Sequence, residues 1–292
     1  MTAAPLPGYD IVAVLGQSNA SGTNDDYEPS GCDTRDERVR VFAASGPNGR
    51  SIQPAVEPLA SLLGPGSGMG PGGPFAQELL AHIPAGRRVL IVPCAVGGTG
   101  FGAHGSFPGL WKVSDRTPGV LNLFEFSMVH LRRAIAAADA AGSTRAAAVL
   151  WHQGEADARP GRREADHAAD LDDLIDAFRA RLPLFARAPF LVGQLAAERL
   201  TDQPGADEVD AAHRATPRRR PWTGFAPAPG PGYCTRDRTH FSAEGQRRLA
   251  RSYLQAWLRV RDQEIVGSDG DSAVPGAAAA LAGEGYRLYR NS

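Results

Sequence analysis

Residues 9–22 have the sequence YDIVAVLGQSNASG, in which an uninterrupted apolar run leads directly into a polar, glycine-bounded turn. The segment Tyr9–Leu15 is short, apolar and partly β-branched, which is typical of a strand buried on both faces. Four more runs of this kind occur, each bounded by Gly, Pro or polar residues: Val39–Ala43, Arg88–Cys94, Ala146–Trp151 and Pro189–Leu195. The pattern therefore predicts five strands.

Helical patterns alternate with these strands along the chain: Pro74–Ile83, Leu121–Ala141, Ala165–Arg181 and a last helix after Ser242. Alternation of this kind predicts an α/β fold, a three-layer α/β/α sandwich with a mainly parallel five-stranded sheet. In the last helix Ser242 is a good N-cap, and Glu244 places negative charge where the helix dipole favours it. The apolar residues that recur there at helical spacing predict a face that packs on the sheet: Leu249, Tyr253, Trp257 and Leu258.

The length of 292 residues suits one domain, and 42% hydrophobic with 22% charged residues is ordinary for a globular protein. We expect a domain at 9–262, an N-terminal extension at 1–8 and a flexible C-terminal tail at 263–292, where small residues dominate. The run Arg218–Arg220 lies between two prolines and is interpreted as a solvated loop.

Charge and cysteine content exclude several classes of protein. The net charge of −1 gives no field that would attract nucleic acid or an anionic membrane, so neither partner is expected. The first residues lack the pattern of a secretory signal and no apolar run reaches about 18 residues, which favours a cytoplasmic location. Three widely spaced cysteines indicate neither a disulfide framework nor a zinc site, although a Cys32–Cys234 bridge stays open; no metal or cofactor is expected.

Polar residues follow three of the predicted strands, in the segments Gly16–Gly22, Ala95–Gly100 and His152–Asp157. Ligands of open parallel sheets bind where the carboxyl ends of the strands converge. Just before the last helix, Asp237 and His240 supply a carboxylate and an imidazole three residues apart. A serine hydroxyl becomes an effective nucleophile when such a pair accepts its proton, so these segments predict a hydrolytic site. Each segment alone could also be an ordinary turn, and the Asp–His pair could ligate a metal.

At these positions the sequence resembles the SGNH hydrolases, within them the sialate O-acetylesterase-like and carbohydrate acetylesterase branch. Four blocks carry the resemblance in family order across residues 9 to 260: GQSNASG at 16–22, GGT at 97–99, WHQGE at 151–155 and DRTHFS at 237–242. By contrast, Gly16-x-Ser18-x-Ala20 lacks the last glycine of the G-x-S-x-G motif of α/β-hydrolases.

The resemblance implies an SGNH, flavodoxin-like fold and a catalytic role for three residues. Ser18 would attack the ester carbonyl, His240 would act as general base, and Asp237 would orient His240. The oxyanion would be bound by the backbone N–H of Ser18, the backbone N–H of Gly98 and the side-chain amide of Gln153, which stands where many of these enzymes have Asn. Glu155 is the alternative orienting acid, although a residue three before the base reaches its ring within one turn.

The remaining site residues are expected to contact the substrate: Gln17, Asn19, Gly97, Trp111 and Trp222. The two tryptophans, with Phe101, His104 and Tyr233, could form a rim that stacks on sugar rings, or could simply pack loops. The sequence thus predicts a serine esterase that removes a short acyl group, acetyl above all, from a carbohydrate. Its alternatives are a broad short-chain carboxylesterase and a non-catalytic carbohydrate-binding module; no oligomeric state is indicated.

Overall fold

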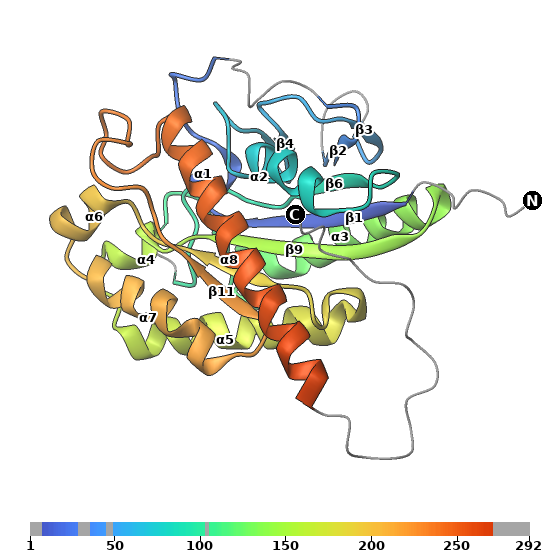
Figure 1. Cartoon of the computed structure of the whole chain (residues 1–292). Coiled ribbons are helices and arrows are strands. Elements are labelled where there is room, and N and C mark those ends of the chain that lie inside the picture. The colour runs from blue at the N-terminus through green and yellow to red at the C-terminus, as the bar shows by residue number, and fades with distance from the viewer. Residues whose placement is uncertain (1–7, 29–35, 45–48, 103–104, 271–292) are drawn as a thin grey trace, which may run out of the picture.

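The computed structural model describes residues 8–28, 36–44, 49–102 and 105–270. Its centre is a seven-stranded sheet in the order β11-β10-β9-β1-β6-β2-β3, in which every neighbouring pair is parallel except β2 and β3 (Figure 1). The strands are β1 (Tyr9–Gly16), β2 (Val39–Phe42), β3 (Ile52–Pro54), β6 (Arg88–Pro93), β9 (Thr144–His152), β10 (Phe190–Gly193) and β11 (Thr223–Ala226). The predicted mainly parallel α/β sheet is confirmed. The strand count of five is wrong, because β3 and β11 extend the two edges.

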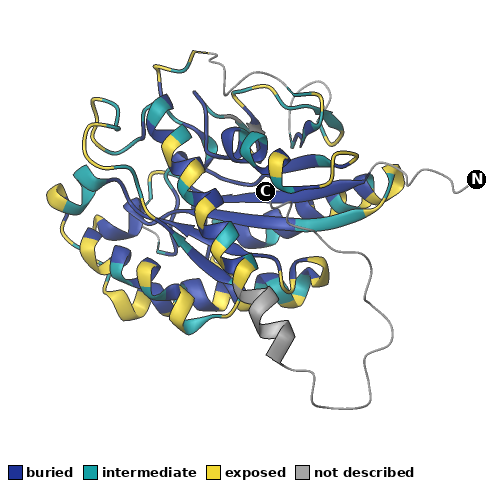
Figure 2. Ribbon diagram, viewed as in Figure 1, coloured by how far each residue is buried: buried dark blue, intermediate teal, exposed yellow. Residues whose placement is uncertain are grey.

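Helices cover both faces of the sheet, as the three-layer prediction requires. Alternate residues of a strand point to opposite faces, and from Ile11 to Leu15 of β1 both sets are apolar and buried. Ile11, Ala13 and Leu15 pack in one core with α3 (Leu123–Ala141) and α5 (Glu164–Arg181). Val12 and Val14 pack in a second core with α2 (Gly72–Leu79) and α8 (Ala243–Gly270). Figure 2 shows the sheet buried and the exposed residues on the outer sides of the helices.

The last helix begins as predicted. Ser242 precedes α8, and its Oγ accepts a hydrogen bond from the backbone N–H of Gly245 at 3.1 Å, the N-cap geometry. Leu249, Tyr253 and Trp257 are buried against the sheet. The helix continues to Gly270, past the domain boundary predicted at 262. Residues 271–292 of the predicted tail and 1–7 of the predicted extension lie outside the described residues.

One long helix was not predicted. Residues of α7 (Ala206–Arg219) include Pro217, and the arginines after it were interpreted as a loop. That interpretation is wrong, because the chain is helical through Arg219, whose Nε lies 2.9 Å from Oδ2 of Asp172 on α5.

The other elements are short: α1 (Ser18–Ser21), β4 (Ala60–Ser61), β5 (Gly64–Pro65), β7 (Gly109–Leu110), β8 (Leu121–Asn122), α4 (Glu155–Ala158), α6 (Ala197–Asp202) and 3₁₀ turns at Leu80–His82 and Pro183–Phe185. In the described part of the chain, no helix has the length and apolar character needed to cross a membrane.

The strand order brings the polar segments together. β6 and β9 lie on either side of β1, so the loops after these three strands leave the same edge of the sheet. The chain crosses from one side of β1 to the other between β6 and β9, and such a reversal of strand order opens a crevice at the carboxyl ends. Gly16 has a φ of +127°, and a Cβ there would lie 2.0 Å from the carbonyl oxygen of His152. Only glycine permits this close turn into α1.

Candidate active site

Ser18, His240 and Asp237 lie in hydrogen-bonding contact at this edge of the sheet. Nε2 of His240 is 2.8 Å from Oγ of Ser18, and Nδ1 of the same ring is 2.5 Å from Oδ2 of Asp237. Ser18 is the first residue of α1 and is 8% exposed, whereas the side chains of His240 and Asp237 are 22% and 48% exposed. The serine comes from the first strand end and the other two residues from the turn before α8. The arrangement can move a proton from the hydroxyl to the imidazole.

The turn around Asp237 holds its carboxylate ionised. Burial raises the pKa of Asp237. The hydrogen bonds from the backbone and ring N–H of His240 and from the backbone N–H of Thr239 together lower it by more, so the pKa lies below its ordinary value. Oδ1 accepts from the backbone N–H of Thr239 at 2.8 Å and of His240 at 2.9 Å. Arg238 has a φ of +58° and its Nε lies 2.6 Å from Oδ2 of Asp202, which fastens the turn to α6.

Glu155, the alternative acid, is buried and faces another partner. Its Oε1 accepts a hydrogen bond from Nδ2 of Asn19 at 2.6 Å and lies 3.6 Å from Nδ1 of His152. Asn19 Nδ2 also donates to the carbonyl oxygen of Thr239 at 3.0 Å, and Asn19 Oδ1 accepts from the backbone N–H of Phe241 at 3.0 Å. Asn19 therefore ties the residues on both sides of His240 to the helix that carries the nucleophile.

Gln17 and Asn19 were expected to contact substrate, and their placement does not support that role. Both side chains are buried. Asn19 is occupied by the contacts above. Oε1 of Gln17 is 3.3 Å from the backbone nitrogens of Gly154 and Ala156, which donate to it at the start of α4. These side chains join the loops of the site to one another, a role that their local sequence does not reveal.

The donors expected for the oxyanion lie around Ser18. As the first residue of α1, Ser18 has a backbone N–H without an acceptor inside its helix. Gly98 adopts a φ of +68°, and a Cβ on Gly97 would lie 3.7 Å from Cβ of Ser18, so the glycine turn passes directly beside the nucleophile. Nε2 of the buried Gln153 donates to Oδ2 of Asp157 at 2.8 Å. Its other acceptors, Oε1 of Gln17 and the carbonyl oxygen of Thr99, are both 3.4 Å away.

The aromatic residues expected to form a sugar-binding rim are mostly placed elsewhere. Trp111 is fully buried, its Nε1 donates to Oγ1 of Thr99 at 3.0 Å, and its ring packs edge-on against Trp151. Phe101 is also buried. Trp222 directly precedes β11, at the amino end of the strand and opposite the site. The substrate contacts predicted for the two tryptophans are therefore not supported, and loop packing describes them instead. Tyr233 is half-buried beneath the guanidinium of Arg248.

Two expectations concern residues outside the described part of the chain. His104, proposed for the rim, and Cys32, proposed as a disulfide partner of Cys234, are both in undescribed segments. Sγ of Cys234 lies 3.2 Å from Oε2 of Glu198. His152, another histidine of the site region, is fully buried, and burial lowers its pKa.

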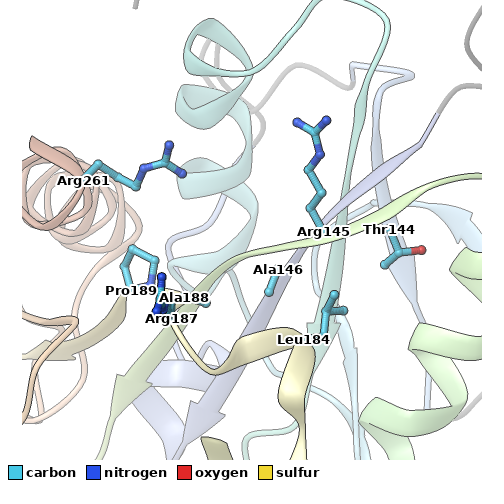
Figure 3. Close-up of a pocket in the computed structure, with 8 residues that line it drawn as sticks. All are labelled: Thr144, Arg145, Ala146, Leu184, Arg187, Ala188, Pro189 and Arg261. Atoms are coloured by element: carbon cyan, nitrogen blue, oxygen red, sulfur yellow. The ribbon is translucent and has the colours of Figure 1, made fainter. Parts of the chain in front are cut away.

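A pocket elsewhere on the molecule does not include the site (Figure 3). It is lined by Thr144, the first residue of β9, by residues just before β10, and by Arg261 of α8. These positions lie at the amino ends of the strands, at the edge opposite Ser18. Three arginines border it: Arg145, Arg187 and Arg261.

Comparisons with known proteins find one matching family and several similar folds. The family model for "Carbohydrate esterase, sialic acid-specific acetylesterase" matches residues 8–259. A crystal structure of an Arabidopsis thaliana protein is 22% identical, covers 87% of this chain and 98% of its own, and has a TM-score of 0.68. The crystal structure of NanS is 20% identical, covers 89% and 99% respectively, and has a TM-score of 0.69. No curated protein matches the chain significantly.

Proposed function

We propose how this chain acts from its family and its site: it belongs to the sialic acid-specific acetylesterase family of carbohydrate esterases and is a carboxylic ester hydrolase. The proposal is that it removes acetyl groups from a carbohydrate through an acyl-enzyme on Ser18. The observation that carries the proposal is the continuous contact from Ser18 through His240 to Asp237. A serine without a neighbouring base is a poor nucleophile, and this geometry supplies both the base and its orienting carboxylate.

In the proposed reaction Ser18 Oγ attacks the ester carbonyl while Nε2 of His240 takes the hydroxyl proton. Asp237 stabilises the imidazolium that forms, because its carboxylate contacts Nδ1 of the same ring. When the tetrahedral intermediate collapses, the C–O bond to the sugar breaks and His240 returns its proton to the leaving oxygen. A water molecule, deprotonated by His240, then attacks the acyl-serine. When this second tetrahedral intermediate collapses, the C–Oγ bond breaks, His240 returns the proton to Ser18 Oγ, and acetate leaves.

The negative oxygen of each intermediate is assigned to N–H donors. The backbone N–H of Ser18 belongs to the nucleophile itself, and we assign the second donor to Gly98 because its neighbour Gly97 packs beside Ser18. Gln153 Nε2 donates to Asp157 at 2.8 Å, and its other two acceptors are 3.4 Å away. We assign the second N–H of this amide to the oxyanion, with the hydrogen bond to Asp157 kept. Donors held in place before the reaction contribute a factor of ~10²–10³ each to the rate.

The test combines a substrate screen with two serine variants. Released acetate is measured with acetylated sugars and with an aryl acetate, and with the corresponding butyrates. Ser18→Ala should lower kcat by several orders of magnitude while the far-UV circular dichroism stays unchanged. Ser21→Ala is the matched control, since Ser21 is on the same short helix but its Oγ donates to the carbonyl oxygen of Ser18.

The outcomes separate the competing functions. Faster turnover of acetylated sugars than of simple acetates supports the carbohydrate acetylesterase, and equal turnover of all short esters points to a broad carboxylesterase. Near-wild-type turnover by folded Ser18→Ala would reject the acyl-enzyme on Ser18. Binding of sugars without any turnover by the wild type would leave a carbohydrate-binding module. The cytoplasmic location and the absence of nucleic-acid and membrane partners stay predictions.

A further inference from the structure

One buried carboxylate near the site has no role in proton transfer. Asp157, the third residue of α4, is fully buried and accepts three hydrogen bonds. Its Oδ2 accepts from Gln153 Nε2 at 2.8 Å and from the backbone N–H of Phe101 at 2.9 Å, and its Oδ1 accepts from the backbone N–H of Gly102 at 3.0 Å. The carboxylate therefore joins the loop after β9 to the loop after β6.

Both of these loops carry donors assigned to the oxyanion. Gln153 supplies its amide from one loop, and Gly98 lies a few residues before Phe101 in the other. The second loop is also held on its far side, since Thr99 Oγ1 donates to the carbonyl oxygen of Val96 at 2.7 Å and accepts from Trp111 Nε1. With Asp157 in place, neither the amide nor the glycine turn can shift alone.

The Asp157 carboxylate packs so closely against the loop after β6 that position 100 of this loop favours glycine. A Cβ on Gly100 would lie 2.8 Å from Oδ1 of Asp157 and 3.0 Å from its Cγ. Gly100 is not among the glycines with positive φ, so the requirement comes from the carboxylate and not from the backbone conformation. The position of Asp157 and the identity of residue 100 are thus linked.

A cation, Arg162, lies near the negative charge of Asp157. Nη1 of Arg162 lies 3.8 Å from Oδ1 of Asp157. His167 Nδ1 is 3.8 Å from Oδ2, but burial first, and then the nearby Arg162 and Arg219, lower the pKa of His167 to about 3, so its ring is neutral near pH 7. Three N–H donors and one guanidinium stabilise the buried carboxylate, as such a charge requires.

We propose that Asp157 is a positioning residue that fixes Gln153 and the 98–102 backbone as one oxyanion-binding unit, an inference that rests on the proposed esterase function. By holding one hydrogen of the Gln153 amide, it leaves the other hydrogen directed to the intermediate. The effect is on the transition state, because the oxyanion exists only there, so loss of Asp157 lowers kcat and leaves KM nearly unchanged.

The test is a double-mutant cycle with Asp157→Asn and Gln153→Ala on an aryl acetate. The new amide places an N–H group among three donors, so Gln153 loses its alignment. Each single variant is expected to lower kcat about 10²-fold, with KM within about 3-fold of wild type. The double variant is expected to show about the same 10²-fold loss, because both changes remove the same unit. If instead the two single losses multiplied, so that the double variant lost about 10⁴-fold in kcat, the proposal would be overturned.

Two further variants separate positioning from stability. Asp10→Asn removes another fully buried carboxylate, paired with Arg87 at the amino end of β1, and should lower the melting temperature without lowering kcat. Gly100→Ala displaces the Asp157 carboxylate and keeps its charge, so it should reproduce the selective loss of kcat. Should Asp157→Asn fail to fold, an unchanged kcat in Gly100→Ala would overturn the proposal.

The experiments distinguish failure of the proposed function from failure of the role proposed for Asp157. If Ser18→Ala stays active, the acyl-enzyme is rejected, whatever the Asp157 variants do. If Ser18→Ala is inactive and folded Asp157→Asn keeps the wild-type kcat, the esterase stands and the positioning role is rejected.

Discussion

Replacement of Asp237 and of Glu155 by their amides decides which carboxylate orients the base. Asp237→Asn keeps the size of the side chain but removes the charge that contacts Nδ1 of His240. Hydrogen bonds to a charged group contribute ~1.5–3 kcal/mol, which corresponds to about 10- to 150-fold in rate. Because the Asp237 side chain is 48% exposed, solvent screens this contribution, and we expect a kcat loss of about 10- to 100-fold.

Glu155→Gln should be much milder. Asn19 Nδ2 donates to Oε1 of Glu155, and the carbonyl oxygen of a glutamine can accept the same hydrogen bond. The clamp that Asn19 forms on Thr239 and Phe241 then survives, so kcat should fall less than about 5-fold. The comparison separates two effects. Asp237→Asn tests the negative charge next to the His240 ring, and Glu155→Gln tests the hydrogen bonds of Asn19 that hold the residues on both sides of His240.

Both variants are measured on one aryl acetate, with kcat and KM determined separately between pH 5 and 9. Asp237 keeps its carboxylate ionised over this range, because its pKa lies below the ordinary value. Protonation of Asp237 therefore does not contribute to the pH dependence measured over this range. If Asp237→Asn kept most of its kcat and folded Glu155→Gln lost it by orders of magnitude, the orienting acid would be Glu155 and Asp237 would only shape the turn before α8.

Three further outcomes are expected. His240→Ala should remove most of kcat, because His240 is the base assigned to Ser18; a variant that kept its kcat would require another base. EDTA should leave activity unchanged, since N–H donors serve the oxyanion, and a loss reversed by one divalent ion would contradict this. Burial lowers the pKa of His167 to about 3 and of His130 to about 4, so the unfolded chain binds more protons below about pH 6.5. The free energy of unfolding should then fall from pH 6.5 towards pH 4, by up to ~1.4 kcal/mol per pH unit for each histidine, and urea midpoints equal at pH 7 and 5 would refute it.

The sheet was largely predictable because its inner strands are continuous apolar runs, as in Ile11–Leu15. Its edges were not: β11 is four residues long with a glycine inside, and β3 is a three-residue edge strand that pairs antiparallel with β2, so neither carries a strong local pattern. The helix α7 was hidden by Pro217. The helix is stabilised by packing on α5 and by ion pairs such as Arg219 with Asp172. The helix propensity of the local sequence does not reveal these tertiary contacts.

The residues that meet at Ser18 were predictable from motif spacing and strand order, while side-chain directions were not. Asn19 faces Thr239 and Phe241, more than 200 residues away, and Trp111 faces inwards to Thr99. Nothing within a few residues of either side chain specifies those partners. Asp157 could have been suspected from its i, i+4 relation to Gln153, but its contacts with Phe101 and Gly102 depend on the tertiary fold.

The central place of β1 has a consequence for synthesis of the protein. This strand is made first, yet its partners β6 and β9 begin only at Arg88 and Thr144. A ribosome adds about 5–20 residues per second, so the apolar segment Tyr9–Gly16 waits roughly 4 to 14 seconds for its first neighbour. During that time its N–H and C=O groups form two open edges on an apolar strand, a hazard for aggregation. A nascent chain that pauses before Arg88 therefore exposes an apolar strand with both edges unpaired, and we expect such chains to need a chaperone that covers it.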